Sequence, residues 1–144
     1  MIGHLKKQEQ QSKDRMMSNV KDKLFKGNEL KVLEGDSSFA ALLRQEGDEI
    51  RRDVWMVMNP EESASGRIQI GLTTVYPGCR TKGHSHPDRE EVYYFTHGRG
   101  IMGLDDKEYE VQAGDTFYVK PGPHHTTKNP DDVPLEFFWI TIKV

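Results

Sequence analysis

Cysteine is almost absent from this sequence. Cys79 is the single cysteine in 144 residues, so no disulfide can form within the chain. The chain also has no run of about 18 apolar residues, which a membrane-spanning helix requires. Residues 1–26 lack the apolar segment of a secretory signal peptide. The net charge of −3 gives no excess of positive charge for binding nucleic acid.

These absences define the expected setting of the protein. A chain of 144 residues corresponds to one domain and can bury a core without disulfides. We therefore expect a cytoplasmic protein that binds neither nucleic acid nor membranes and that acts on a small molecule.

The N-terminal region differs in composition from the rest of the chain. Residues 1–26 contain seven Lys or Arg and three Asp or Glu. A thin apolar stripe at helical spacing runs through this region: Leu5, Met16, Val20 and Leu24. We expect residues 1–28 to form a polar tail or helix and residues 29–144 to form a single domain. Within that domain, 30–33 is a short strand candidate, and 37–44 is a candidate for one or two helical turns capped by Ser37.

Most of the domain consists of short segments with the composition of strands. They are separated by turns rich in Gly, Pro and Asp. The expected strands are 53–58, 67–76, 80–86, 91–97, 100–104, 107–111, 115–120 and 135–143. No internal repeat is present. This pattern predicts an all-β fold, a single barrel or sandwich, with short helical segments at the N-terminus.

The last predicted strand is apolar on both faces after Glu136. Its sequence is Leu-Glu-Phe-Phe-Trp-Ile-Thr-Ile over residues 135–142. A strand buried on both faces in so small a protein indicates a second copy on the outer face, and we expect a homodimer. The alternative is a well-covered core strand.

A histidine pair marks the first candidate site. His84 and His86 are two residues apart, so in a strand both side chains point to the same face. Two imidazoles on one face can bind one Zn, Cu, Fe or Ni ion. Glu91 opens the next apolar run and can return its carboxylate across a tight loop. Glu90 is the rival ligand, because parity alone decides only in part.

A second segment provides the fourth candidate ligand. A short β-run after Gly114 ends at Pro121, because proline cannot donate to a strand ladder. His124 and His125 follow directly. Neighbouring residues point to opposite faces, so only one of the two is expected to face the metal.

The two segments, residues 78–98 and 114–129, resemble the two motifs of the cupin superfamily. In the first motif the matching residues are Gly78, His84, His86, Glu91 and Gly98. In the second they are Gly114, Gly122, His125 and Asn129, with Lys120 where the motif has a proline. The resemblance covers about residues 67–144. It implies a small double-stranded β-helix, or jelly-roll, barrel, and it selects Glu91 over Glu90 and His125 over His124.

On a five- or six-coordinate metal, four protein ligands leave one or two coordination positions open, and an open position distinguishes a catalytic from a structural site. We expect one divalent transition metal: Mn, Fe, Ni, Co or Zn. Tyr93 lies two residues beyond Glu91 on the same face, and a tyrosine beside a divalent metal can have a lowered pKa and act as a general acid or base. The alternative for Tyr93 is a core tyrosine bonded to a backbone carbonyl. Arg80, Lys82 and His124 are the candidates for substrate binding.

Two cupin subfamilies look similar in detail. Cupin-type phosphoglucose isomerases share Thr-x-Gly-His-x-His at residues 81–86 and Glu-Val-Tyr at 91–93. They differ in a longer, glutamate-containing segment between the Pro-Gly and the His-x-His and in a longer gap before the metal glutamate. Cupin lyases that cleave dimethylsulfoniopropionate share the Leu-Glu-Phe-x-Trp-Ile string at residues 135–140. Both resemblances imply an isomerase or lyase that acts by metal-assisted proton abstraction from a small polar or anionic substrate. The alternatives are an Fe(II)-dependent dioxygenase and a non-catalytic module that binds a small metabolite.

Overall fold

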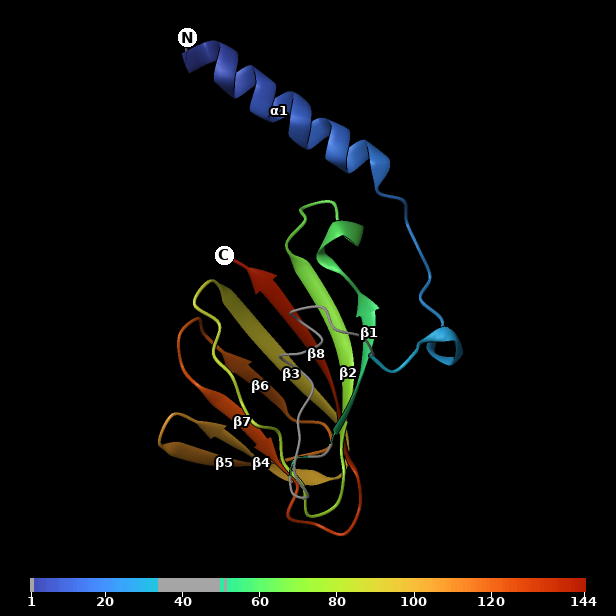
Figure 1. Cartoon of the computed structure of the whole chain (residues 1–144), viewed down its shortest axis with the longest axis vertical. Helices are drawn as coiled ribbons and strands as arrows, with labels where there is room; N and C mark the ends of the chain where they lie inside the picture. Colours follow the sequence, from blue (N-terminus) through green and yellow to red (C-terminus); the bar gives the residue numbers. More distant parts are fainter. Residues whose placement is uncertain (1, 34–49, 51) are drawn as a thin grey trace.

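The computed structural model describes residues 2–33, 50 and 52–144. Two antiparallel sheets make up the barrel, and helix α1 (Ile2–Asn19) is drawn apart from both of them (Figure 1). The strands are β1 Arg52–Met58, β2 Ile68–Val75, β3 Arg89–His97, β4 Arg99–Leu104, β5 Lys107–Gln112, β6 Thr116–Val119, β7 His125–Lys128 and β8 Leu135–Lys143. Two short 3-10 helices lie at η1 (Gly27–Glu29) and η2 (Pro60–Glu62). The all-β fold class with an N-terminal helix is confirmed.

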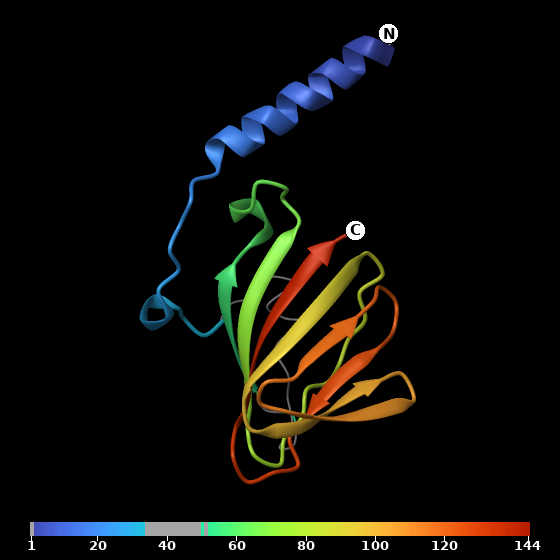
Figure 2. The same ribbon diagram turned by 180° about the vertical axis from the view of Figure 1, so that it is seen from behind.

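The two sheets have different sizes. One has five strands in the order β1-β2-β8-β3-β6, and the other has three in the order β5-β4-β7. Figure 2 shows from behind how the two sheets face each other as the walls of an open barrel. The large sheet therefore provides one wall of the interior, and the small sheet provides the opposite wall.

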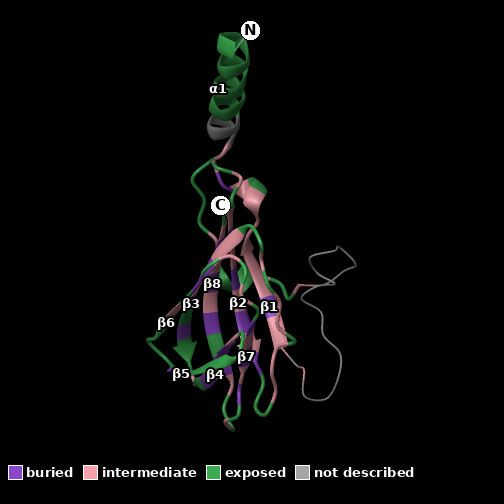
Figure 3. Ribbon diagram, turned by 90° about the vertical axis from the view of Figure 1, so that its left-hand side faces the viewer, coloured by how far each residue is buried: buried purple, intermediate pink, exposed green. Residues whose placement is uncertain are grey.

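The core lies between the sheets, and strand alternation determines what faces it. Along β2 and β8 every second residue is buried, which Figure 3 shows as alternating bands. The inward residues of β2 include Gln69, Thr73 and Val75, so the more polar face of this strand is the buried one. The interior of the barrel is thus partly polar, as a binding cavity requires.

The outer face of β8 is partly exposed. Phe138, Ile140 and Ile142 alternate with buried neighbours and keep an intermediate exposure. The apolar pattern of β8 matches the prediction, but the outer face of the strand is only half-buried in the single chain. The homodimer remains a prediction.

The segment 80–86, expected to be a strand, is a loop. It makes only isolated bridges, between Arg80 and Lys128 and between His84 and His125. Gly83 has a φ of +86°, which interrupts an extended strand and which side-chain-bearing residues rarely adopt. The prediction of a continuous strand here was wrong for that reason.

The N-terminal predictions have mixed outcomes. An α-helix covers residues 2–19, and its described side chains are exposed. The strand expected at 30–33 is reduced to an isolated bridge between Val32 and Trp55. The helical turns predicted at 37–44 lie outside the described residues. Among the described residues, no helix is long and apolar enough to cross a membrane. The division of the chain at residues 28 and 29 stays a prediction.

Gly71 in β2 makes room for the indole ring of Trp139. A Cβ atom at this position would overlap the ring directly, and the indole N–H donates to Thr73 Oγ1 at 2.9 Å. We expect Gly71→Ala to lower the free energy of unfolding by about 1–3 kcal/mol, because overpacking forces backbone shifts. Urea unfolding followed by tryptophan fluorescence measures this. Gly27→Ala is the matched control, because nothing lies within 4 Å of a Cβ there. Equal urea midpoints for the two variants would show that the ring moves aside without cost.

Candidate metal centre

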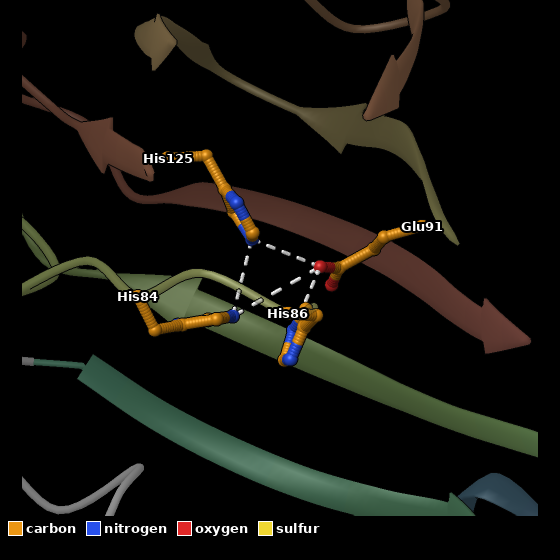
Figure 4. A group of neighbouring side chains, drawn as sticks. All are labelled: His84, His86, Glu91 and His125. Carbon is orange, nitrogen blue, oxygen red and sulfur yellow. Dashed lines mark hydrogen bonds and ion pairs between the residues drawn. The ribbon is translucent and has the colours of Figure 1, made fainter. Parts of the chain in front are cut away.

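Four side chains from three parts of the barrel converge on one point. His84 and His86 come from the loop between β2 and β3, Glu91 comes from β3, and His125 begins β7 in the small sheet (Figure 4). One ligand atom from each residue lies within 4.8 Å of the other three. The cluster therefore joins the two sheets.

The distances between the donor atoms fit a single ion. His125 Nε2 lies 3.0 Å from Glu91 Oε2 and 3.1 Å from His84 Nε2. Glu91 Oε2 is also 3.4 Å from His86 Nε2 and 3.9 Å from His84 Nε2. Neighbouring donors bound to one divalent ion at about 2.1 Å lie roughly 3.0–3.4 Å apart, so most of these separations are those of a ligand set.

An orphaned nitrogen supports the same interpretation. His86 Nε2 is buried and has no hydrogen-bond partner in the described part of the chain, although it is 3.4 Å from the Glu91 carboxylate. A buried polar atom without a partner is costly, and a bound ion removes that cost. His84, His86, Glu91 and His125 can thus hold a divalent metal ion.

The backbone fixes the ligands before any ion binds. His84 and His125 exchange two hydrogen bonds: His84 N donates to His125 O at 3.1 Å, and His125 N donates to His84 O at 2.9 Å. His125 Nδ1 lies 3.2 Å from the carbonyl oxygen of Pro123. Because a carbonyl only accepts, Nδ1 carries the proton and Nε2 keeps its lone pair for the cluster.

The electrostatics of the cluster give the protonation states that a metal needs. Burial raises the pKa of Glu91, but the imidazoles of His125, His84 and His86 that surround the carboxylate outweigh it and leave the pKa far below its ordinary value. Burial lowers the pKa of His84, and the nearby Glu91 carboxylate partly offsets this. An ionised carboxylate and a neutral imidazole are the forms that bind metals.

A small cavity opens beside the cluster. The space for water centres in it is about 40 Å³. Besides the four candidate ligands, the cavity is lined by Arg52, Val54, Thr73, Thr81, Tyr93, Thr127, Phe137, Trp139 and Thr141. At about 10–15 Å³ for each water, this is room for about three waters, so the site suits a small ligand.

Tyr93 lies in this cavity as the sequence predicted. It is only 4% exposed, and its ring makes an edge contact with His125. Burial, followed by the charge of Glu91 and a hydrogen bond with it, raises the pKa of Tyr93 well above its ordinary value. In the absence of a cation on Glu91, the Tyr93 phenol is therefore protonated. Glu91 is therefore the neighbour that influences the protonation of Tyr93. Among the described contacts of Tyr93, none is a hydrogen bond to a backbone carbonyl.

The structure distinguishes the two rival pairs of ligands. Glu90 accepts a hydrogen bond from the Tyr118 hydroxyl at 3.2 Å, on the opposite face of β3 from Glu91. His124 is exposed, and its backbone N–H donates to Asp105 Oδ1 at 3.0 Å. Neither belongs to the cluster.

The predicted substrate-binding residues lie elsewhere. Arg80, Lys82 and His124 are not among the described residues that line the cavity. Arg52 does line it, and sequence analysis overlooked it because β1 is far from both motifs. Strand alternation could have indicated Arg52, because residues two apart in a strand share a face and Val54 is buried.

Asn129, the last residue of the second motif, has a structural role. Its side chain is 1% exposed. Asn129 Nδ2 donates to Val75 O at 2.9 Å and to Val133 O at 2.8 Å, and Asn129 Oδ1 accepts from Asp131 N at 3.1 Å. It ties the end of β7 to β2 and to the loop before β8.

An antiparallel two-sheet barrel whose interior presents three imidazoles and one carboxylate to one point is a jelly roll with a candidate metal site. The family model of the cupin domain matches residues 71–141, and the chain belongs to the cupin family.

Similar proteins agree with this assignment. The uncharacterized protein MJ1618 of Methanocaldococcus jannaschii is 44% identical over 80 residues, 56% of this chain and 64% of that protein. A glucose-6-phosphate isomerase of Thermococcus litoralis is 30% identical over 135 residues, 85% of this chain and 70% of that protein. The chain thus spans less than two thirds of the first of these relatives.

A solved structure shows the same fold. The crystal structure of a predicted oxalate decarboxylase from Thermotoga maritima matches with a TM-score of 0.68. The match covers 85% of this chain and 100% of that chain at 18% identity. Similarity at this level of identity supports the fold alone.

Proposed function

We propose that this cupin is a metal-dependent enzyme, an isomerase or lyase that promotes proton abstraction from a small polar or anionic substrate. The observation that carries the proposal is the placement of the Tyr93 side chain in the same small cavity as the candidate ligands His84, His86, Glu91 and His125. A proton-transfer group and a cation site that share one cavity form a reaction site.

The residues that line the cavity have separate roles in the proposed reaction. A bound divalent ion supplies positive charge that polarises a carbonyl or carboxylate of the substrate. With a cation on the candidate ligands offsetting the charge of Glu91, the Tyr93 hydroxyl would release its proton, and the phenolate oxygen would then accept the proton from the substrate carbon. Phe137, Trp139 and Val54 wall the cavity with apolar surface and keep bulk water from the reacting carbon. In isomerisation the proton returns to the adjacent carbon, and in elimination the electron pair expels a group from the β-carbon.

The relatives support this reaction type. The Thermococcus litoralis relative is named a glucose-6-phosphate isomerase, and aldose–ketose isomerisation moves a proton between adjacent carbons. Elimination from a carboxylic acid begins with the same removal of a proton from carbon. The common first step is the part of the proposal that both subfamily resemblances support.

Replacement of Tyr93 tests the proposal. We expect Tyr93→Phe to reduce anaerobic deuterium exchange at the substrate carbon by about 10²–10⁴-fold, because the variant lacks the general acid–base group. Proton NMR in D₂O follows the exchange with a panel of small 2-hydroxy and 2-oxo acids and aldose phosphates. Metal content by elemental analysis should stay unchanged, because Tyr93 is not a ligand.

Tyr94→Phe is the matched control for this experiment. Tyr94 is the next residue in β3, is 46% exposed, and points away from the cavity. Exchange that survives in Tyr93→Phe contradicts the assigned role. Consumption of oxygen by the iron-loaded protein alone would identify a dioxygenase. Binding without turnover for every metal form would identify a non-catalytic module.

We also propose that the protein forms a homodimer through the outer face of the five-stranded sheet and that it is cytoplasmic. Sedimentation at several protein concentrations checks the first.

A further inference from the structure

Arg52 places a positive charge at the cavity. It is the one Lys or Arg among the described residues that line the cavity. Its Nη2 atom is buried and has no hydrogen-bond partner in the described part of the chain. A buried, unsatisfied donor on a charged group costs free energy, and proteins seldom keep one without a use.

The carboxylate of the neighbouring residue in sequence is already engaged elsewhere. Asp53 is the next residue in β1, and its side chain accepts a hydrogen bond from the Tyr76 hydroxyl. Arg52 and Asp53 project to opposite faces of the strand. Burial lowers the pKa of Arg52 to about 10, with Asp53 raising it in part, so the guanidinium stays charged at neutral pH.

The carboxylate within the cavity is also committed. Glu91 contacts the imidazoles of His125, His86 and His84. All other lining residues outside the candidate ligands and Arg52 are uncharged at neutral pH. The described walls of the cavity therefore supply no free anion to Arg52.

The threonines that line the cavity have partners as well. Thr73 Oγ1 accepts from Trp139 Nε1 at 2.9 Å, and Thr141 Oγ1 accepts from Arg89 Nη1 at 3.1 Å. Thr81 Oγ1 accepts from Thr127 N at 2.9 Å, and Thr127 Oγ1 donates to Met102 Sδ at 3.2 Å. Arg52 Nη2 is thus a charged donor at the cavity without a hydrogen-bond partner in the described part of the chain.

We propose that Arg52 binds the carboxylate of a small organic acid whose other polar end reaches the His84–His86–Glu91–His125 cluster. The inference rests on the proposed function and names its substrate class. Guanidinium binds a carboxylate through a strong, charge-assisted hydrogen bond. The cavity, with a volume of about 40 Å³, fits an acid of about two to four carbons.

Binding of a matched pair of probes tests the assignment. Lactate and lactamide have nearly the same shape, but only lactate carries a negative charge. We expect calorimetry on the zinc-loaded protein to show lactate binding at least about 10-fold more tightly than lactamide. Arg52→Met should weaken lactate binding by about 10–100-fold and remove the preference for lactate, and Arg52→Lys should restore part of it.

Stability distinguishes a binding role from a structural one. Without ligand, Arg52→Met removes a buried, unpaired charge, so its urea midpoint should equal or exceed that of the wild type. Arg67→Met, at an exposed arginine before β2, is the control and should leave lactate binding unchanged. A lower urea midpoint for Arg52→Met would identify a structural residue and overturn the proposal.

The remaining outcomes separate this inference from the proposed function. Equal binding of lactate and lactamide, no binding of either, or tighter binding of inorganic phosphate or glucose 6-phosphate would overturn the carboxylate assignment. Deuterium exchange could still occur in that case. If lactate binding depends on Arg52 but no acid undergoes deuterium exchange, the carboxylate-binding role of Arg52 is supported and the proposed enzymatic function is rejected.

Discussion

Replacement of His125 by alanine is expected to remove the metal from the protein. His125 Nε2 has the shortest contacts in the cluster, 3.0 Å to Glu91 and 3.1 Å to His84. Its loss takes away one ligand and the group that holds Glu91 in place. Removal of a partner outside the ligand set already costs about 10–100-fold in metal affinity, so loss of a ligand should cost more than about 100-fold. Elemental analysis after reconstitution with Mn, Fe, Co, Ni or Zn measures the bound metal.

His124→Ala is the control that the chain itself offers. It alters the adjacent residue, which is exposed and outside the cluster, and should leave about one ion per chain. Circular dichroism must show that both variants are folded. Equal metal content in the two variants, or none in the wild type after reconstitution, would contradict the metal centre.

The second large effect concerns Asn129. Asn129→Ala should lower the free energy of unfolding by about 3 kcal/mol or more, because three buried or half-buried backbone groups lose their partner at about 1–3 kcal/mol each. Against a typical total of about 5–15 kcal/mol, this is a large fraction. The side chain holds the carbonyls of Val75 and Val133 and the amide of Asp131. Urea unfolding of the metal-free protein measures the change.

Two further variants make this result specific. Asn28→Ala, at an exposed asparagine in η1, should change stability by less than about 0.5 kcal/mol. Asn129→Asp keeps the acceptor for Asp131 but loses both N–H donors, so it should also destabilise. A stable Asn129→Ala variant would mean that water replaces the amide at both carbonyls.

Strand periodicity was sufficient to predict most of the fold. Residues 135–143 were expected as a strand and form β8 with the same bounds, because a short run of aromatic and β-branched residues favours a strand. Residues 80–86 were not a strand, because the positive φ of Gly83 interrupts them. A single sequence gives the residue type at Gly83 but not the backbone conformation that tertiary contacts select there.

The candidate ligands were accessible from sequence because they are close together along the chain. His84, His86 and Glu91 span eight residues, and motif spacing added His125. Arg52 was not accessible in this way, since it reaches the cavity only through the pairing of β1 with β2. Proximity in sequence favoured Arg80 and Lys82 instead, and the strand arrangement excludes both from the cavity lining among the described residues.

The place of β8 in the large sheet has a consequence during synthesis. This strand comes last along the chain but lies in the middle of the sheet, between β2 and β3. Until residues 135–143 have left the ribosome, β2 and β3 each expose an unpaired edge, and such edges recruit strands from other chains. A chain whose synthesis stops before Leu135 would therefore keep both edges unpaired and be prone to aggregate.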